Sequence, residues 1–498
     1  MNLAILLVTS LLTLVSYYRW LRVAQREHYE PGRLLAIEGI WTKARPVELV
    51  LLLAVVAVCV ASFWMPYGAL VGALLWLAWP VGMSFVGPKR LVFTDRVKRL
   101  GGVLIALHLV LTIVLALVPV PLAGVLPIAA VPLAEAALAI MWPAEKRMAR
   151  KWQVQAAETI RKVSPRIVAI TGSYGKTSTK NYTTHLMQGR WSTLASPASF
   201  NNAAGLSRAV NERLTPGTDV FVAEMGTYGP GEIAKLTEIF PPEVSAITTI
   251  GEAHLERMKT RETIVRAKSE ILPQARTVVL NVDVPELAAI ADELAASKRV
   301  IRCSAQPGTK ADVRVIGSTL EIEGATYEVT MPEEVGHPSN VAVAVGLALA
   351  VDVPAETIVQ RLPQIPGTAH RAETNKTPGG VWVVDDTFNS NPDGAAAALA
   401  KAQKLAGESG TVWTITPGMV ELGTEQATRN AEFAKAATAT DRLQLCIVGR
   451  TNRKALRSGE AARTHEFDSR KAAADHVLAS ASAGDVVLYE NDLPDHYA

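Results

Sequence analysis

The chain has 498 residues, enough for about three domains, and its formal net charge of only +3 argues against a nucleic-acid-binding protein. Three widely separated cysteines, Cys59, Cys303 and Cys446, argue against a zinc site or a disulfide framework and for free thiols in a reducing compartment. Hydrophobic residues make up 49% of the chain and are concentrated before residue 145. This distribution predicts a membrane region followed by soluble domains.

Residues 1–145 are predicted to form an α-helical membrane region with about five spans. The apolar stretches that approach the roughly 20 residues needed to cross a bilayer are 2–18, 47–65, 67–86, 102–119 and 122–142. Lys and Arg occur after the first, third and fifth stretches and are absent from the other two connections. By the positive-inside rule, the N-terminus lies outside and everything after 145 lies in the cytoplasm. A multi-pass protein of the cytoplasmic membrane is expected, with 146–164 as a linker.

Two features of this region allow more than one interpretation. The first stretch has the length of a cleaved signal peptide, but no basic segment precedes it and bulky aromatic residues end it, so a retained anchor is preferred. Glu135 lies within the fifth stretch, where a carboxylate is a functional candidate; pairing with a basic residue at the interface is the alternative. His108 is a weaker candidate of the same kind.

A phosphate-binding loop is predicted directly after the linker. The apolar strand Arg166–Thr171 leads into a glycine-containing turn and a helix, through the residues Gly172, Ser173, Tyr174, Gly175, Lys176, Thr177 and Ser178. Backbone N–H groups at such a helix end hold phosphates, the lysine adds charge and the Thr177 hydroxyl can bind Mg²⁺. The general pattern requires a glycine where this chain has Ile170, so a glycine-rich turn with a surface lysine is the alternative.

Residues 165–366 alternate between strand-like and helix-like segments, which predicts a central α/β domain with a mostly parallel sheet. Ligands bind at the C-terminal ends of the strands in such sheets. Glu224 ends one expected strand and His254 follows another, while Asn201 and Asn202 lie in a loop. A carboxylate, an imidazole and a hydroxyl at one sheet edge suit a metal–phosphate site, although surface or capping roles are the alternative for each residue.

Nine blocks of sequence occur in the order found in the Mur ligases. They are TGSYGKTSTK, SPASFNNAAGLS, FVAEMGTYGPGEIAKL, AITTIGEAHLERM, RAKSEIL, GHPSNVAVAVGLAL, AHRAE, VVDDTFNSNPDG and TPGMVELG. Over about residues 165–490 the chain resembles this family, most of all the MurF branch that adds D-alanyl-D-alanine to the UDP-muramoyl tripeptide. The short G-x-x-G-K-T spacing is the family's own form of the phosphate loop.

The resemblance implies specific roles for residues of the central domain. Lys176 would contact the β- and γ-phosphates of ATP, Thr177 and Glu224 would hold one Mg²⁺, and His254 would hold a second together with Lys268. In this family the lysine that matches Lys268 is carbamylated; an ordinary surface lysine is the alternative. Asn202 or its neighbour Asn201 would lie near the γ-phosphate, and Asn340 near the adenine.

Residues 367–498 are predicted to form a second, smaller α/β domain that resembles the dinucleotide-fold C-terminal domain of Mur ligases. Four apolar strands recur in it, at 381–385, 411–416, 444–448 and 485–489. By the resemblance, Arg371 reaches the ATP phosphates and Asp386 holds the ribose hydroxyls, with Asn389 and Asn391 in the same loop. Glu421 and Gly449–Lys454 are candidates to meet the amino substrate.

The resemblance implies an ATP-dependent ligase that activates a carboxylate as an acyl phosphate and couples it to an amine, without a protein nucleophile. The expected partners are an amino acid or dipeptide and a peptidyl wall precursor. Membrane stretches stand where the family has its UDP-binding domain, so the precursor is either lipid-linked or UDP-linked with the stretches as a tether. The alternatives from another class are a membrane transport ATPase and a non-catalytic scaffold.

Overall fold

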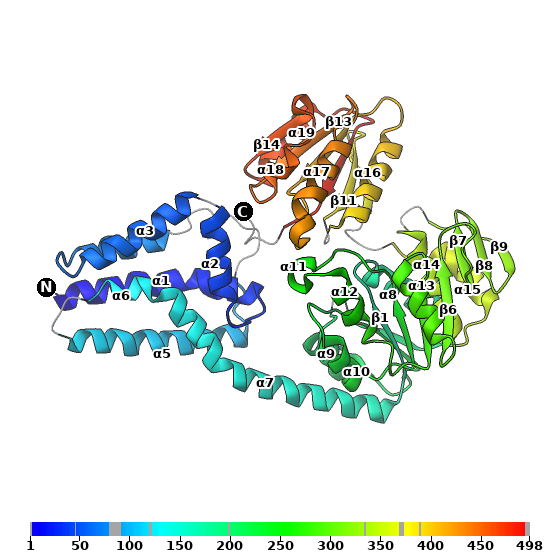
Figure 1. Ribbon diagram of the computed structural model, residues 1–498, viewed down its shortest axis with the longest axis horizontal. Coiled ribbons are helices and arrows are strands. Elements are labelled where there is room, and N and C mark those ends of the chain that lie inside the picture. Colours follow the sequence, from blue (N-terminus) through cyan, green and yellow to red (C-terminus); the bar gives the residue numbers. More distant parts are fainter. Residues whose placement is uncertain are drawn as a thin grey trace. The chain divides into compact units, whose positions relative to one another are not determined.

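The computed structural model describes residues 2–44, 46–78, 91–118, 122–197, 200–332, 335–367, 373–387 and 390–493. These residues form two compact units, a helical unit that extends to Met148 and an α/β unit over Ala149–Asp492. Figure 1 shows the helical unit in blue and cyan, and the two sheets of the α/β unit in green to yellow and in yellow to red.

Described helices of the N-terminal part are α1 (Asn2–Arg26), α2 (Arg33–Ala44), α3 (Pro46–Ala61), α4 (Gly68–Ala78), α5 (Asp95–Leu117), α6 (Val125–Ile128) and α7 (Ala130–Val163). Helix α1 packs against α4 and α5, and α3 packs against α4. Helix α5 begins where the Thr94 hydroxyl accepts a hydrogen bond from the backbone N–H of Val97, an N-cap that satisfies one of the helix's free donors.

The prediction of about five spans is not supported. Of the described helices, only α1 and α5 are long and apolar enough to cross a bilayer, and this rests on length and composition alone. Helices α3 and α4 have 16 and 11 residues, short of the roughly 20 that a perpendicular crossing needs. Residues 79–90 and 119–121, which belong to the predicted third and fourth stretches or their ends, lie outside the described residues.

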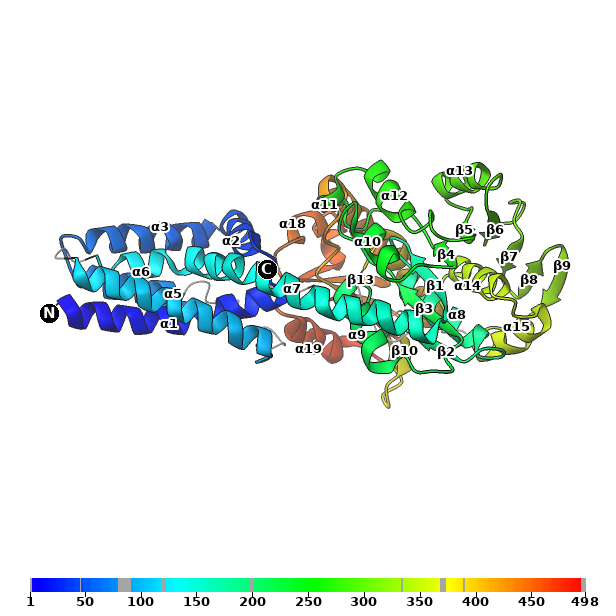
Figure 2. The same ribbon diagram turned by 90° about the horizontal axis from the view of Figure 1, so that it is seen from below.

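The predicted linker 146–164 is helical as far as Val163, where it forms the C-terminal part of helix α7. This helix continues through Pro143 for 34 residues without an end at the predicted span boundary (Figure 2). Its C-terminal part is packed rather than free, since Ala156 and Ile160 are buried in the core of the α/β unit. Residues 149–163 are thus an integral helix of that unit.

The helical unit buries polar side chains and exposes apolar ones. Leu3, Leu7, Leu11 and Val15 form an exposed stripe along α1, with Leu11 63% exposed. On the buried side, Nε2 of His108 lies 2.7 Å from Ser10 Oγ and Nδ1 lies 2.9 Å from the Tyr17 hydroxyl. These contacts occupy both ring nitrogens, so His108 has a packing role here.

Glu135 is a helix cap in this structure. Its carboxylate accepts hydrogen bonds from the backbone N–H groups of Gly32, at 2.7 Å, and Leu35, at 3.1 Å. Gly32 directly precedes α2 and Leu35 lies in its first turn, where N–H groups have no partner within the helix. The residue therefore joins α7 to α2, and this contact accounts for the carboxylate without a reaction.

The central domain contains a nine-stranded sheet with the order β2-β3-β1-β4-β5-β6-β7-β8-β9. Its strands are β1 (Arg166–Thr171), β2 (Thr193–Ala195), β3 (Val220–Glu224), β4 (Val244–Ile247), β5 (Thr277–Asn281), β6 (Arg299–Ser304), β7 (Val313–Ile316), β8 (Thr319–Ile322) and β9 (Ala325–Glu328). Pairing is parallel from β2 to β7 and antiparallel from β7 to β9. The parallel part confirms the predicted α/β fold.

Two apolar cores cover the faces of this sheet, as expected for parallel strands. The helices of the domain are α8 (Lys176–Met187), α9 (Ala203–Arg213), α10 (Glu232–Ile239), α11 (Leu255–Met258), α12 (Arg261–Ser269), α13 (Pro285–Leu294), α14 (Pro338–Ala350), α15 (Ala355–Arg361) and the 3₁₀ turn η1 (Leu362–Gln364). Helix α14 is almost entirely buried against α8 and the strands. One core includes Val168 and Val222, the other Phe221 and Ala223.

The C-terminal domain has a six-stranded sheet with the order β10-β11-β15-β12-β13-β14. The strands are β10 (Glu373–Lys376), β11 (Trp382–Asp386), β12 (Val412–Thr416), β13 (Leu443–Val448), β14 (Thr464–Phe467) and β15 (Val486–Glu490). The helices are α16 (Pro392–Ala406), α17 (Gln426–Ala436), α18 (Arg453–Leu456) and α19 (Arg470–Ser480), with 3₁₀ turns η2 (Gly423–Glu425) and η3 (Ala461–Arg463). All pairings except β10 with β11 are parallel.

Candidate active site

The phosphate loop joins the C-terminal end of β1 to the first turn of α8. Gly175 caps α8 with a φ of +79°, in the left-handed region that glycine adopts without strain. A Cβ at this position would lie 2.1 Å from Oδ1 of Asn340, so the loop requires glycine for close packing as well. The exposed N–H groups of the helix end and its dipole make this turn suited to an anion.

Lys176 and Ser173 shape the loop from within. The Lys176 ammonium donates to the carbonyl oxygens of Gly172, at 2.9 Å, and Ser173, at 3.3 Å. The Ser173 hydroxyl accepts from the backbone N–H of Gly251 at 2.9 Å, which ties the loop to the segment after β4. Ser178, the third residue of α8, is buried. The loop is therefore held in shape by contacts of its own side chains.

A buried carboxylate, Glu224, lies beside the loop at the end of β3 and is 1% exposed. Its Oε2 accepts from the Thr177 hydroxyl at 2.9 Å and lies 3.4 Å from the ammonium of Lys180. Its Oε1 accepts from the Asn201 amide at 3.2 Å. The structure thus brings together a hydroxyl, a carboxylate, an amide and a buried ammonium.

Two details of this cluster differ from expectation. Asn201 faces Glu224, whereas the predicted Asn202 caps α9, accepting from the backbone N–H of Gly205 at 2.9 Å. Lys180 had no predicted role beyond its place in the loop sequence. Its position one helical turn after Lys176 was the available signal, since residues three or four apart on a helix share a face.

Lys268 is a second buried lysine, 1% exposed near the C-terminal end of α12. Burial lowers its pKa well below the usual range, and the charge of nearby Lys176 lowers it further. Burial therefore favours the neutral amine, which is nucleophilic, over the ammonium. An ordinary surface lysine, the alternative reading of this position, is excluded by the burial.

His254 lies in the turn before α11, with a left-handed φ of +62°. Its Nδ1 is 2.7 Å from Oε2 of Glu421, a residue of the C-terminal domain that was expected near the amino substrate. The ring also meets the edge of Tyr228, with 4.8 Å between centroids. His254 is thus held in place by groups from two domains.

The residues around the loop fit a Mg²⁺–nucleotide complex. Among the described residues, no group of three His, Cys, Asp or Glu side chains could hold a metal ion alone. Mg²⁺ does not require such a cage, because it usually takes one or two protein oxygens and completes its shell with phosphate oxygens and water. Thr177 Oγ1 and the Glu224 carboxylate, directly beside an anion-binding turn, supply that pair.

In the C-terminal domain the predicted ribose residue, Asp386, ends β11 at the edge where parallel strands terminate. The neighbouring Asp385 accepts from the Thr387 hydroxyl at 2.6 Å and stabilises the turn. Asn391 caps α16, accepting from the backbone N–H of Gly394 at 3.0 Å. Arg371 and Asn389 lie outside the described residues.

The buried carboxyl of Glu490 was missed from the sequence. It follows Tyr489 at the end of β15 and accepts hydrogen bonds from the hydroxyls of Ser390 and Thr416. Burial raises its pKa to about 7. Because Ser390 comes after β11 and Thr416 ends β12, this carboxyl joins segments at the ends of three strands, beside Asp386.

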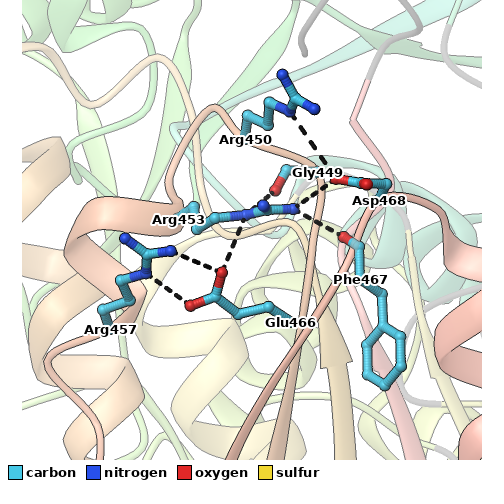
Figure 3. Close-up of polar contacts among 7 residues, drawn as sticks. All are labelled: Gly449, Arg450, Arg453, Arg457, Glu466, Phe467 and Asp468. Carbon is cyan, nitrogen blue, oxygen red and sulfur yellow. Dashed lines mark hydrogen bonds and ion pairs between the residues drawn. The ribbon is translucent and has the colours of Figure 1, made fainter.

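The segment Gly449–Lys454 follows β13 and leads into α18. Its arginines make several polar contacts (Figure 3). The Arg453 guanidinium donates to the Gly449 carbonyl at 2.7 Å and to Asp468 at 3.1 Å. Arg450 lies 3.8 Å from the same aspartate and is 60% exposed. Arg453 is therefore structural, while Arg450 presents a cation at the sheet edge.

Comparisons with known proteins agree with this geometry. Residues 170–344 match the Mur ligase middle domain, and residues 370–489 match the Mur ligase, glutamate ligase domain. The UDP-N-acetylmuramoyl-tripeptide–D-alanyl-D-alanine ligase of Mycobacterium leprae is 33% identical over 321 residues, 57% of this chain and 61% of that protein. The Bacillus subtilis protein of the same name is 25% identical over 350 residues, 66% and 74% of the two chains.

Solved structures show the same fold. A crystal structure of MurF from Acinetobacter baumannii superposes with a TM-score of 0.59 at 25% identity, over 69% of this chain and 77% of that one. The MurF ligase of Thermotoga maritima in complex with ADP has a TM-score of 0.60 at 21% identity, over 69% and 80%. The chain spans about three fifths of the length of the mycobacterial relatives it matches.

Proposed function

Because this chain belongs to the Mur ligase family, we propose that it is an ATP-dependent ligase that joins a carboxylate to an amine. The observation that carries the proposal is the Thr177–Glu224 pair, with a hydroxyl-to-carboxylate distance of 2.9 Å, beside a helix end that suits phosphates. Each of these groups is buried or half-buried on a strand or helix of the central sheet. The arrangement suits phosphoryl transfer, which depends mostly on positioning and electrostatics.

The chain's own residues divide this work. When bound, ATP supplies the phosphoryl group that activates the acceptor carboxylate as an acyl phosphate for attack by the amine. Lys176 would exchange its contacts with the Gly172 and Ser173 carbonyls for phosphate oxygens. Thr177 and Glu224 would hold Mg²⁺, and Asn201 would orient a phosphate oxygen. Asn340 packs on the loop, and Asp386 would accept from the ribose hydroxyls.

We assign Lys268 to a second metal position as a carbamate. A neutral lysine amine attacks CO₂, the new N–C bond forms and a proton leaves, which converts a cation into a carboxylate-like metal ligand. Its burial and its lowered pKa provide the neutral amine that this step needs. His254 would complete that position with a ring nitrogen.

The substrates are proposed from the relatives. Their printed names specify UDP-N-acetylmuramoyl-tripeptide and D-alanyl-D-alanine. We propose a peptidyl cell-wall precursor as the carboxylate and an amino acid or dipeptide as the amine. The exposed Arg450 at the end of β13 provides a cation for the carboxylate of such an amine.

We further propose that the helical unit lies in the cytoplasmic membrane, with the α/β unit in the cytoplasm. An exposed apolar stripe on α1 and buried polar contacts around His108 are the pattern of a protein surrounded by lipid. Such an anchor would place the ligase beside a lipid-linked precursor. Alternatively, the helical unit only tethers an enzyme that uses UDP-linked precursors. The assay below distinguishes these two roles of the helical unit.

The test is ADP release by the full-length protein in lipid nanodiscs. We expect release to require both a muramoyl-tripeptide acceptor and D-alanyl-D-alanine; ATP turnover that is indifferent to both would contradict a ligase. Offering the acceptor in UDP-linked and lipid-linked forms tests the membrane proposal separately. Equal turnover of the two forms would overturn the lipid-linked assignment and leave the ligase proposal standing.

A further inference from the structure

We propose that Glu421 is a positioning residue, which orients the metal-binding imidazole of His254 from the C-terminal domain. Metal binding in the central domain would then depend on contact with the domain that carries Asp386 and the segment Gly449–Lys454. This inference rests on the proposed role of His254 as a metal ligand.

Glu421 contacts the segment around His254 through both its side chain and its backbone. Oε2 of Glu421 lies 2.7 Å from Nδ1 of His254, and the carbonyl of Glu421 accepts from the backbone N–H of Glu256 at 3.2 Å. Gly423 packs so closely that a Cβ on it would lie 3.2 Å from the Glu256 backbone. The Glu421 carboxylate therefore reaches His254 from a segment that is itself docked on the same turn.

Both residues adopt the left-handed conformation that non-glycine residues rarely use. The φ angles are +62° for His254 and +65° for Glu421. Such backbones cost free energy, on the order of 1 kcal/mol or more each, and persist where the surroundings require them. Here the two residues with this conformation are in direct contact through their side chains, at 2.7 Å.

The chemistry of the pair determines which nitrogen remains for a metal. A carboxylate accepts a hydrogen bond, so in the neutral ring of His254 this contact selects the tautomer with the proton on Nδ1 and the lone pair on Nε2. Carboxylates that hold a ligand histidine in this way fix the ring orientation and raise its basicity as a ligand. Tyr228 restricts the ring from another side, with its centroid 4.8 Å away.

The chain also offers a matched control. Arg429 of α17 donates to both carboxylate oxygens of Glu252, at 3.0 and 3.1 Å from its Nε, two residues before His254. This pair joins the same two segments but does not touch the imidazole. Removing it weakens the domain contact without removing the group that orients the ring.

The experiment uses the full-length protein in nanodiscs with Mn²⁺ and a non-hydrolysable ATP analogue. Pulsed electron paramagnetic resonance detects coupling between Mn²⁺ and an imidazole nitrogen, and H254A assigns it to this residue. In E421A we expect loss of that coupling and about a 10–100-fold weaker second Mn²⁺ site, the usual effect of removing such a partner. E421Q, which keeps a hydrogen-bond acceptor, should recover part of both, and R429A should keep the coupling.

Three results would overturn the inference, and each can be told from the others. If E421A keeps the nitrogen coupling and binds Mn²⁺ as the unaltered protein does, Glu421 does not position His254, while the proposed metal role of His254 stands. If the unaltered protein shows no coupling that H254A removes, His254 is not a ligand, and the proposed metal site fails together with this inference. Coupling lost equally in R429A and E421A would assign the effect to domain contact alone.

Discussion

The two units of this protein distribute polar and apolar side chains in opposite ways. In the α/β unit, Phe221 and Val222 on β3 are fully buried on the two faces of the sheet, and the polar groups gather at the strand ends. In the helical unit, apolar side chains such as Leu11 point outward and polar ones such as Ser10 and His108 are inside. The first pattern is typical of a core in water, and the second is the one from which we propose that lipid surrounds the helical unit.

The two units also bury different kinds of polar side chain. Buried polar side chains around His108 in the helical unit satisfy one another through neutral hydrogen bonds. In the α/β unit, Glu224 at the end of β3 and Lys268 on α12 are buried ionisable groups; Glu224 accepts from Thr177, and Lys268 feels the charge of Lys176. Burying such groups costs free energy, so their occurrence around the phosphate loop supports a functional site there.

Truncating one apolar side chain to alanine in each unit tests this difference, and the largest effect is expected in the α/β unit. Phe221→Ala should destabilise the α/β unit by about 3–5 kcal/mol, because it leaves a cavity in a packed core. Leu11→Ala should change stability by less than about 0.5 kcal/mol in lipid, because the side chain is on the surface. Urea unfolding followed by hydrogen exchange of each unit measures both, and similar losses would contradict the assignment of Leu11 to a lipid-facing surface.

The second prediction concerns the rate of ligation at the phosphate loop. Lys176→Ala should lower kcat for ligation by about 10²–10³-fold, because the variant lacks the cation that stabilises the transferring phosphoryl group. The fold should survive, since the half-buried side chain donates to the loop carbonyls of Gly172 and Ser173 and is not part of an apolar core. Steady-state ADP release gives the rate. The control is Lys235→Ala on the exposed face of α10, and equal rates for the two variants would remove Lys176 from the site.

A third effect tests the buried carboxyl of the α/β unit. Burial raises the pKa of Glu490 from 4.5 to about 7, so the folded state favours the protonated form. Stability from this group is full below pH 4.5 and is lost as the pH rises through 7. The loss is about 3 kcal/mol, from about 1.4 kcal/mol for each pKa unit.

Comparison of the unaltered protein with Glu490→Gln measures this contribution. We expect the difference in unfolding free energy between them to vary across pH 4.5–7, because the amide does not titrate. Hydrogen exchange of the β15 amides as a function of pH reports it. A difference that stays constant over this range would show that Glu490 titrates normally in the folded protein.

The smallest expected effect is that of Glu135, and it distinguishes capping from catalysis. Glu135→Ala should destabilise the helical unit by about 1 kcal/mol, the usual cost of a lost N-cap, through the N–H groups of Gly32 and Leu35. Glu30→Ala, at an exposed position of the same unit, is the control. Loss of ligation with unchanged stability would instead make Glu135 a functional carboxylate.

The sequence was informative where a local pattern determines structure. The strand before Gly172, the helix after it and the strands that end at Glu224 and Asp386 were predicted within a residue or two, because apolar runs and turn residues specify them directly. The hairpin β7–β9 was missed, since its short strands carry polar residues such as Glu321 and Arg314 and are defined by pairing with one another.

Other errors have equally physical causes. Composition cannot distinguish a span from a packed helix, so α7 was divided at a place where the structure is continuous. The roles of Asn201 and Asn202 depend on one residue of register at a helix end, which the sequence does not specify. Glu490 was missed because its partners, Ser390 and Thr416, come from strands that only the fold brings together.

We propose that the α/β unit activates a carboxylate by phosphoryl transfer. The transfer of oxygen isotope from the carboxylate to phosphate tests this step directly. The full-length protein is given ATP, D-alanyl-D-alanine and a muramoyl-tripeptide whose terminal carboxylate carries two ¹⁸O atoms. Each amide bond formed through an acyl phosphate must transfer one ¹⁸O to the released phosphate, which mass spectrometry detects. We predict one labelled oxygen per phosphate; amide formation accompanied by unlabelled phosphate would contradict the account.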